Sequence, residues 1–177
     1  MQNSKTSSKY VIKEGNEEAF INLKLCANDY IDLIDGFKEK FKNGKYFILT
    51  AYYKEVLIGL LIAEDKSKKV DSIEKIVPTI NLNLIFVNKN YRNNNIGTKL
   101  LNTFIMLQKK RGFASIYITI PEKYKQGLHF FLNNKFLNRQ FRQVGKLNNK
   151  IILEMNLWND LGIFDCQIIK LDTFGFY

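Results

Sequence analysis

Apolar residues in the first half of the chain recur at two spacings, which predict helices and then strands. Residues 17–27 and 29–44 carry apolar side chains at helical spacing, so we expect two consecutive helices there. Two short apolar runs follow at 46–53 and 56–64, and both have the length of a strand. They predict a hairpin, and residues 10–12 predict a short strand before the helices.

The pattern changes again in the middle of the chain. Residues 79–87 first alternate apolar and polar side chains and then become wholly apolar. This pattern predicts a strand that starts with one solvent-exposed face and ends buried. From 96 to 108 the apolar residues step along one face of a predicted helix, with cations in its last turn and Gly112 just beyond. Residues 114–120 predict another strand, which Pro121 closes.

Three further elements complete the predicted order. Residues 124–135 are typical of a helix, and 136–145 and 150–158 predict a final pair of strands. Helices alternate with strands in this half of the chain. The sequence therefore predicts an α/β sheet with at least one parallel pair of strands.

The length of 177 residues is that of one domain. We expect a single domain at 10–158, a loose tail at 1–9 and a C-terminal extension at 159–177 that packs on the domain. No apolar run approaches the roughly 20 residues of a membrane-spanning helix, and the N-terminus lacks the apolar core of a signal peptide. We therefore expect a cytoplasmic protein without a membrane partner.

The net charge of +10 is compatible with a nucleic-acid partner, because Lys and Arg neutralise phosphates. The cations are scattered, however, and the densest clusters, at 66–69 and 109–111, contain no interleaved aromatic residue. The sequence also favours Lys, Asn, Ile, Phe and Tyr, as an AT-rich coding sequence would, so composition is a competing cause of the charge. A polyanionic cofactor would need only a local cluster, and we do not expect a nucleic-acid partner.

The segment NKNYRNNNIGTKLLNTF, at 88–104, joins a predicted strand to a predicted helix. Such a turn presents free backbone N–H groups at the helix N-terminus, where the macrodipole favours negative charge, and phosphate is the natural ligand. Asparagine and glycine tolerate the positive φ that points successive amides at an anion, and Arg92 adds a permanent charge. An ordinary polar turn that caps a core helix would contain the same residues, so the turn alone leaves both interpretations open.

Within this region, LIFVNKNYRNNNIGTKLL resembles the acetyl-CoA-binding motif of the GNAT superfamily of N-acetyltransferases, which reads Arg/Gln-x-x-Gly-x-Gly/Ala after a strand that ends in Val. Arg92 matches the first position, Asn95 stands where glycine is usual, and Gly97 matches the last position. The later strands and helix resemble those of the family as well. The resemblance implies a GNAT fold: a mixed, mostly antiparallel sheet of about six to seven strands with a central, splayed parallel pair and helices on both faces.

The resemblance also implies a site for acetyl-CoA as co-substrate, without a metal. In the family, the loop amides cradle the pyrophosphate, and the pantetheine arm runs along the strand before the loop like an additional strand. A backbone N–H of that strand polarises the thioester carbonyl. The corresponding cofactor-binding residues are Ile85, Phe86, Val87, Arg92, Asn93, Asn94, Asn95, Ile96, Gly97, Thr98 and Phe131, with Lys89, Lys99 or Lys125 within reach of the nucleotide phosphates.

The chain departs from the family pattern where protons are transferred. Many members use a Glu or Asp on the strand before the loop as base and a Tyr on the last helix as acid, and Asn83 and Phe131 occupy those places here. Tyr124 is our first candidate for the acid, and Asn83 could hold a water that relays a proton. Asp71 or Glu74 is a further candidate base if the polar connection folds over the cleft.

The resemblance therefore predicts an N-acetyltransferase that moves acetyl directly from acetyl-CoA to a primary amine. The acceptor would be a protein N-terminus, a lysine or a small molecule, and the protein a monomer or homodimer. The final strands and the connection at 64–78 are expected to line the acceptor pocket. The main alternative is a GNAT-fold module that binds acyl-CoA without catalysis, as the missing acid and base would allow. A basic nucleic-acid binder is the third hypothesis, and it predicts strongly salt-dependent affinity.

Overall fold

The computed structural model describes residues 10–16, 19, 46–67 and 78–158. The helices expected at 17–27 and 29–44 lie outside the described residues, apart from Ala19, which is helical and buried. The extension expected at 159–177 also lies outside them.

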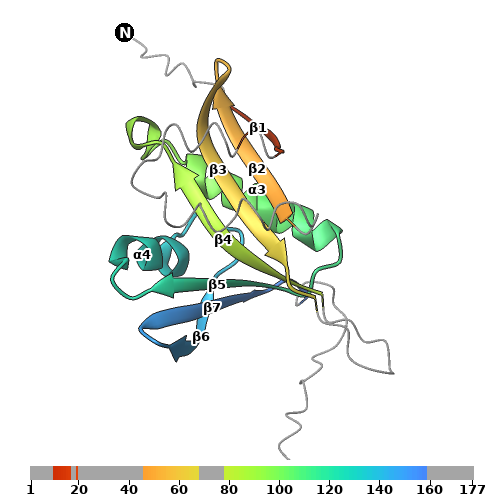
Figure 1. The fold of residues 1–177 in the computed structure, drawn as a ribbon, viewed down its shortest axis with the longest axis vertical. Helices are drawn as coiled ribbons and strands as arrows, with labels where there is room; N and C mark the ends of the chain where they lie inside the picture. The colour runs from red at the N-terminus through yellow and green to blue at the C-terminus, as the bar shows by residue number, and fades with distance from the viewer. Residues whose placement is uncertain (1–9, 17–18, 20–45, 68–77, 159–177) are drawn as a thin grey trace, which may run out of the picture.

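Seven strands form one mixed sheet in the order β1-β2-β3-β4-β5-β7-β6 (Figure 1). Within this sheet β4 and β5 pair in parallel, and the other neighbours are antiparallel. The strands are β1 Val11–Glu14, β2 Tyr46–Tyr53, β3 Val56–Asp65, β4 Thr79–Val87, β5 Ser115–Pro121, β6 Arg142–Leu147 and β7 Lys150–Asn156. The helices are η3 Lys89–Tyr91, a 3-10 turn, then α3 Ile96–Lys110 between β4 and β5, and α4 Lys125–Asn133 between β5 and β6. The predicted mixed, mostly antiparallel sheet with a parallel pair is confirmed.

Helix α3 packs across one face of the sheet (Figure 1). Leu100, Leu101 and Phe104 are 0% exposed, and the Phe104 ring centroid lies 5.7 Å from that of Phe47 on β2. Their spacing gives the helix a single apolar stripe, which this face of the sheet covers. Helix α4 contributes to the same core through Phe131, and a smaller apolar cluster lies on the opposite face of the sheet.

Strand β4 contains a bulge at Asn83. Leu82 lies opposite Ala63 on β3, whereas Leu84 lies opposite Ile62, so Asn83 is an extra residue on β4. A bulge of this kind changes which side chains point to each face, because the alternation along the strand is interrupted. Before the bulge the even-numbered residues pack in the α3 core, and after it the odd-numbered ones do.

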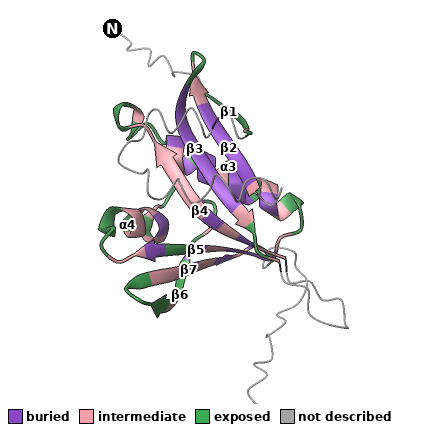
Figure 2. Ribbon diagram, viewed as in Figure 1, coloured by how far each residue is buried: buried purple, intermediate pink, exposed green. Residues whose placement is uncertain are grey.

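The parallel pairing of β4 with β5 covers only the first three residues of β4, and it ends where Asn81 lies opposite Tyr117. Beyond that point the two strands diverge, and α4 lies beside the opening (Figure 1). Residues 83–87 of β4 are consequently half-buried (Figure 2). The expectation that this strand ends buried is therefore wrong, because its neighbour turns away before its last residues.

The segment expected as a strand at 136–145 is a strand only from Arg142 onward. Asparagine side chains take the place of strand pairing before that residue. Asn102 on α3 donates to the backbone oxygen of Phe136 at 2.9 Å and accepts from the backbone N–H of Asn138 at 3.1 Å. The helix expected to reach residue 135 ends at Asn133, where this irregular segment begins.

Candidate functional site

A pocket of about 510 Å³ lies between the end of β4, the turn after it, the first turn of α3 and one side of α4. Its lining is mainly apolar and aromatic, with polar groups at the turn and at the end of α4. The lining residues are Leu84, Ile85, Phe86, Val87, Tyr91, Arg92, Asn93, Asn95, Ile96, Gly97, Thr98, Gln126, Gly127, Phe130, Phe131, Asn134 and Phe136. All of the cofactor residues expected from the sequence are in this lining, except Asn94.

Asn94 lies outside the lining and holds the turn in shape. Its side-chain nitrogen donates to the backbone oxygens of Tyr91 and Arg92, both at 3.2 Å. Arg92 is fixed in turn by a 3.0 Å hydrogen bond from its Nε to the backbone oxygen of Val87. This bond keeps the guanidinium against the end of β4, so its charge lies at the pocket.

The turn exposes a row of backbone amides. Asn93 and Asn95 have φ angles of 64° and 58°, in the left-handed region that asparagine tolerates. The N–H of Lys99 makes the first helical bond, to the oxygen of Asn95 at 3.0 Å. In the described part of the chain, the amides at 93–98 donate no hydrogen bond to another backbone group. They are therefore available to an anion at the positive end of the α3 dipole.

Helix α4 closes the other side of the pocket. Gln126, Gly127, Phe130 and Phe131 lie on one face of this helix, and this spacing is the sequence signal that could have added the first three to Phe131. Asn134, the residue after the helix, also lines the pocket. The side-chain nitrogen of Asn134 donates to the hydroxyl of Thr98 at 2.9 Å and so ties the end of α4 to the first turn of α3.

The family model described as the acetyltransferase (GNAT) family matches residues 13–136. The chain belongs to this acetyltransferase family. No curated protein matches its sequence significantly. The more specific comparisons for this GNAT protein therefore come from solved structures.

Three solved structures illustrate the likeness in fold. The PaiA N-acetyltransferase of Thermoplasma acidophilum, in complex with coenzyme A, is 17% identical with a TM-score of 0.63, over 84% of this chain and 99% of that chain. A GNAT acetyltransferase of Staphylococcus aureus is 21% identical with a TM-score of 0.60, over 84% and 99%. Arabidopsis thaliana NAA60, in complex with a bisubstrate analogue, is 14% identical with a TM-score of 0.65, over 84% and 98%. At these identities the comparisons show the fold of this GNAT domain.

The residues expected to transfer protons are not in the pocket lining of this GNAT domain. Tyr124 lies at the N-terminus of α4 with 45% of its surface exposed, and Lys123 Nζ lies 5.3 Å from the centre of its ring. The side-chain nitrogen of Asn83 donates to Glu64 Oε2 on β3, and its side-chain oxygen accepts from the side-chain nitrogen of Asn81 on β4. Asp71 and Glu74 lie outside the described residues.

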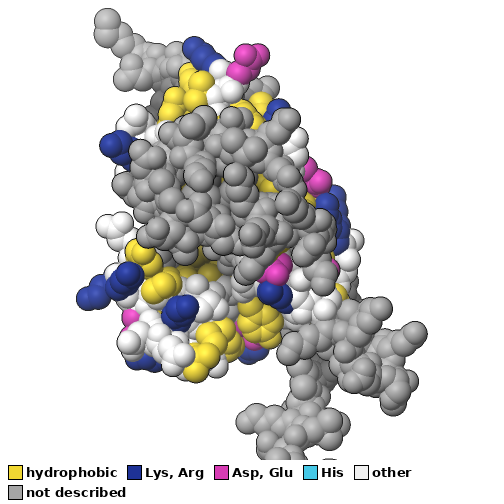
Figure 3. All heavy atoms as spheres, viewed as in Figure 1, with side chains coloured by type: hydrophobic (Ala, Val, Ile, Leu, Met, Phe, Trp, Pro, Cys, Tyr) yellow, Lys and Arg dark blue, Asp and Glu magenta, His cyan; other side chains and the backbone are white. Residues whose placement is uncertain are grey.

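The cations proposed to reach phosphates are also outside the lining of the pocket as described. Lys99 Nζ lies 4.9 Å from the centre of the Tyr10 ring. On the face drawn in Figure 3, the described Lys and Arg side chains lie at several separate places.

Among the described residues, no group of three or more His, Cys, Asp or Glu side chains could bind a metal. None of the described helices has the length and apolarity required to span a membrane.

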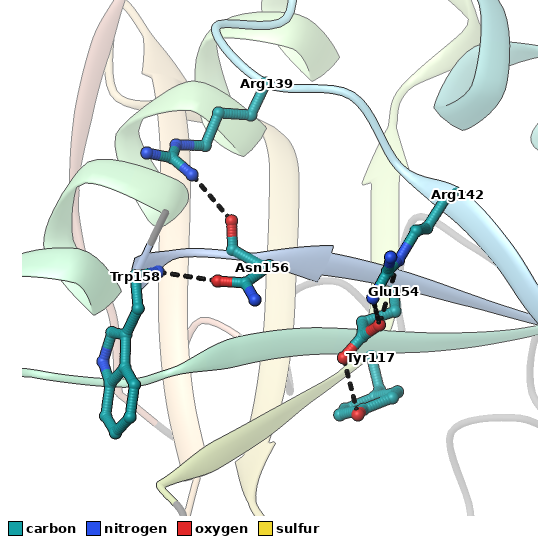
Figure 4. Close-up of polar contacts among 6 residues, drawn as sticks. All are labelled: Tyr117, Arg139, Arg142, Glu154, Asn156 and Trp158. Atoms are coloured by element: carbon teal, nitrogen blue, oxygen red, sulfur yellow. Dashed lines mark hydrogen bonds and ion pairs between the residues drawn. The ribbon is translucent and has the colours of Figure 1, made fainter. Parts of the chain in front are cut away.

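A network of polar side chains connects β5, β7 and β6 (Figure 4). The hydroxyl of Tyr117 donates to Glu154 Oε1 at 2.8 Å, and Arg142 donates to Glu154 Oε2 from both Nε and Nη2, at 3.2 and 2.7 Å. Burial, and then the hydrogen bond and charge of Glu154, raise the pKa of Tyr117, while Ser115 and Arg142 oppose the shift. The phenol is therefore a neutral hydrogen-bond donor at physiological pH.

The same figure shows two contacts at the end of β7. Arg139 Nη1 donates to the backbone oxygen of Asn156 at 2.7 Å, and the backbone N–H of Trp158 donates to the side-chain oxygen of Asn156 at 2.8 Å (Figure 4). The Arg139 contact ties the irregular segment before β6 to the end of β7, and the Trp158 contact shapes the residues that follow β7.

Proposed function

We propose that the protein is an acetyl-CoA-dependent N-acetyltransferase that moves the acetyl group directly to a primary amine. The observation that carries the proposal is the pocket itself. It joins a row of backbone amides and one arginine to an apolar channel beside a strand edge, which matches the charged and the extended parts of coenzyme A. Membership of the acetyltransferase family and the fold shared with a coenzyme A complex support the same conclusion.

Each part of the pocket has a role in this proposal. The amides at 93–98 and the Arg92 guanidinium bind the pyrophosphate, because both favour negative charge. The pantetheine arm lies along Ile85, Phe86 and Val87, whose strand has no β5 partner at these positions. A backbone N–H on that edge would donate to the thioester oxygen as negative charge develops on it.

The reaction is the direct attack of an unprotonated amine on the thioester carbonyl. The C–N bond forms, the C–S bond breaks, and the nitrogen loses a proton as the sulfur gains one. The chain's own residues must therefore hold the amine and accept the proton that the ammonium form carries. Asn83 and Tyr124 remain the proposed groups for relaying and donating protons, although both side chains lie outside the pocket lining.

One observation favours a second function, which is acyl-CoA binding without transfer. The described lining of the pocket contains no carboxylate and no histidine. A module that only binds the thioester needs neither of them. The protein would then bind acetyl-CoA as tightly as an enzyme does, yet release no thiol when an amine is added.

The two functions are separated by one experiment. Acetyl-CoA is mixed with the protein and, in turn, with a polyamine, an alkylamine, a lysine-containing peptide and a peptide with a free N-terminus. Free thiol is followed with a chromogenic disulfide, and binding of acetyl-CoA is measured by calorimetry. We expect amine-dependent thiol release with at least one acceptor. Tight binding without such release would leave only the binding module.

A further inference from the structure

Phe136 has the largest exposed fraction, 73%, of the exposed large apolar residues in the part of the chain that the structure describes. It is also the only one of these exposed residues that lies in the lining of the pocket. The other aromatic residues of the described lining are buried or half-buried, and they are Phe86, Tyr91, Phe130 and Phe131. A single exposed apolar residue is ordinary on a protein surface. In a pocket lining, the same residue is available for contact with a ligand.

The backbone of Phe136 is held by two asparagine side chains. Its N–H donates to the side-chain oxygen of Asn134 at 3.1 Å, and its oxygen accepts from the side-chain nitrogen of Asn102 on α3 at 2.9 Å. The next residue, Leu137, is buried in the core, and its N–H donates to the backbone oxygen of Asn134 at 3.1 Å. The chain thus fixes Phe136 in place without burying its ring. A contact group that is fixed before binding loses little conformational entropy when a ligand arrives.

The same contacts place Phe136 beside the first turns of α3. Strand β4 approaches this helix at Gly97, where a Cβ would lie 3.6 Å from Val87 Cγ2. The segment that contains Phe136 contacts the helix at Thr98, through Asn134, and one turn later at Asn102. The lining therefore passes from β4 to the amides at 93–98 and on to Phe136.

Coenzyme A has its parts in the same order. Its thioester and pantetheine arm are joined through a pyrophosphate to an adenosine 3′-phosphate. A ligand with its arm on residues 85–87 and its pyrophosphate on the amides therefore has its nucleoside beyond the amides. Adenine is flat, and aromatic side chains stack on the faces of nucleic-acid bases. Phe136 offers such a ring at the place that this order gives to the nucleoside.

We propose that Phe136 stacks on the adenine base of acetyl-CoA and so makes the protein selective for the whole coenzyme over its pantetheine half. This inference rests on the proposed binding of acetyl-CoA, and it applies to a transferase and to a binding module alike. The whole arm and the pyrophosphate separate adenine from the thioester. Phe136 therefore stabilises the bound thioester and its transition state equally, and its loss should raise KM without lowering kcat.

The test compares acetyl-CoA with acetyl-4′-phosphopantetheine, which carries the same thioester arm and lacks the nucleoside. Phe136→Ala should raise the Kd for acetyl-CoA about 5- to 150-fold, the usual effect of removing one base–aromatic stack. The Kd for the truncated thioester, also measured by calorimetry, should not change. With an amine that the wild-type protein acetylates, the KM for acetyl-CoA should rise by the same factor at constant kcat.

Val11→Ala is the matched control. Val11 on β1 is also exposed, at 58%, and it lies outside the pocket lining. Its affinity for both ligands should equal that of the wild-type protein. The melting temperature of ligand-free F136A should also match the wild type, because the ring is exposed. If F136A fails to fold, Phe136→Leu replaces it and should weaken acetyl-CoA binding alone, since leucine keeps an apolar side chain but has no ring.

A spectroscopic measurement tests the stack without turnover. Trp158 is the only tryptophan in the chain, so Phe136→Trp combined with Trp158→Phe reports from position 136 alone. Indole also stacks on bases, and this variant should bind acetyl-CoA as the wild-type protein does. Adenosine 3′,5′-bisphosphate, the nucleotide half of the coenzyme, should quench the indole fluorescence as adenine stacks on it. Acetyl-4′-phosphopantetheine should leave the fluorescence unchanged.

The proposal is wrong if folded F136A, or F136L in its place, binds acetyl-CoA with wild-type affinity. It is also wrong if the variant loses affinity for the truncated thioester by the same factor, because the ring would then contact the arm. Absence of quenching by the bisphosphate would contradict it as well. Failure of acetyl transfer looks different, because no amine would then release thiol while acetyl-CoA binding kept its dependence on Phe136. A wild-type protein that does not bind acetyl-CoA would overturn both proposals.

Discussion

Replacement of Gly97 by valine tests whether the amides after β4 bind the cofactor. A Cβ atom at this position would lie 3.6 Å from Val87 Cγ2 and 3.6 Å from Phe130 Cζ, which is ordinary van der Waals contact. Alanine therefore fits without disturbing the fold. Valine adds two methyl groups to a Cβ that already has neighbours on two sides, so we expect at least one of them to occupy the space in front of the amides.

The expected cost follows from the hydrogen bonds that valine would block. A hydrogen bond to a charged group contributes about 1.5–3 kcal/mol, so losing one amide–phosphate bond should raise the Kd for acetyl-CoA roughly 10- to 150-fold. Gly97→Ala should have a smaller effect. Calorimetry with acetyl-CoA measures the Kd, and a thermal melt checks that each variant is folded.

Gly145→Val on β6 is the matched control. A Cβ there would lie 3.7 Å from Ile152 Cδ1, a contact much like that at Gly97, but the position is outside the pocket lining. Its acetyl-CoA affinity should equal that of the wild-type protein. If folded Gly97→Val also binds acetyl-CoA with unchanged affinity, the residues at 93–98 form a polar turn and the amides bind no phosphate.

Three other predictions concern stability and proton transfer. Gln108 is 0% exposed, and neither polar atom of its side chain has a hydrogen-bond partner in the described structure. Gln108→Met should therefore raise the free energy of unfolding by about 1–3 kcal/mol in urea titrations, whereas Gln143→Met at an exposed position should not. A loss of stability in Gln108→Met would show that the side chain has a partner. Tyr124→Phe should lower kcat by about 100-fold at constant acetyl-CoA affinity, because its hydroxyl is the proposed proton donor to the leaving sulfur. Unchanged turnover would leave Tyr124 with a packing role only. The pKa of Tyr117 in the folded state is raised above its ordinary value of 10.0, so this residue contributes fully to stability below pH 10.0 and loses that contribution as the pH rises through the folded-state pKa. Tyr117→Phe should therefore reduce the fall in melting temperature at alkaline pH. An unchanged dependence of melting temperature on pH would contradict this.

The sequence predicted those features of the fold that depend on local pattern. The alternation at 79–82 specifies a strand, and the apolar stripe from Ile96 specifies a helix. The turn residues between them specify the loop. None of these three depends much on the rest of the chain. Much of the pocket lining between Ile85 and Thr98 was predicted from the same segment, because it depends on the local conformation of the strand end and the turn. Asn94 was the exception, because its side chain donates to the backbone of the turn instead of lining the pocket.

Features that depend on pairing between distant strands could not be predicted. The bulge at Asn83 is visible only from its register with β3, and the opening depends on where β5 turns away from β4. Glu64 is separated from Asn83 by 19 positions in the sequence, and no spacing rule brings the two together. The late start of β6 likewise depends on Asn102, which reaches Phe136 from another element.

The early end of the β4–β5 pairing also gives the protein two strand edges in the middle of its sheet. Unpaired edges are sites where other chains can add and where aggregation begins. A bound pantetheine arm would cover the edge of β4, and saturation at about 100 times Kd would add roughly 2.7 kcal/mol to the stability of the folded state. Solubility and resistance to aggregation should therefore rise with the concentration of coenzyme A, and purification in its presence is the practical consequence.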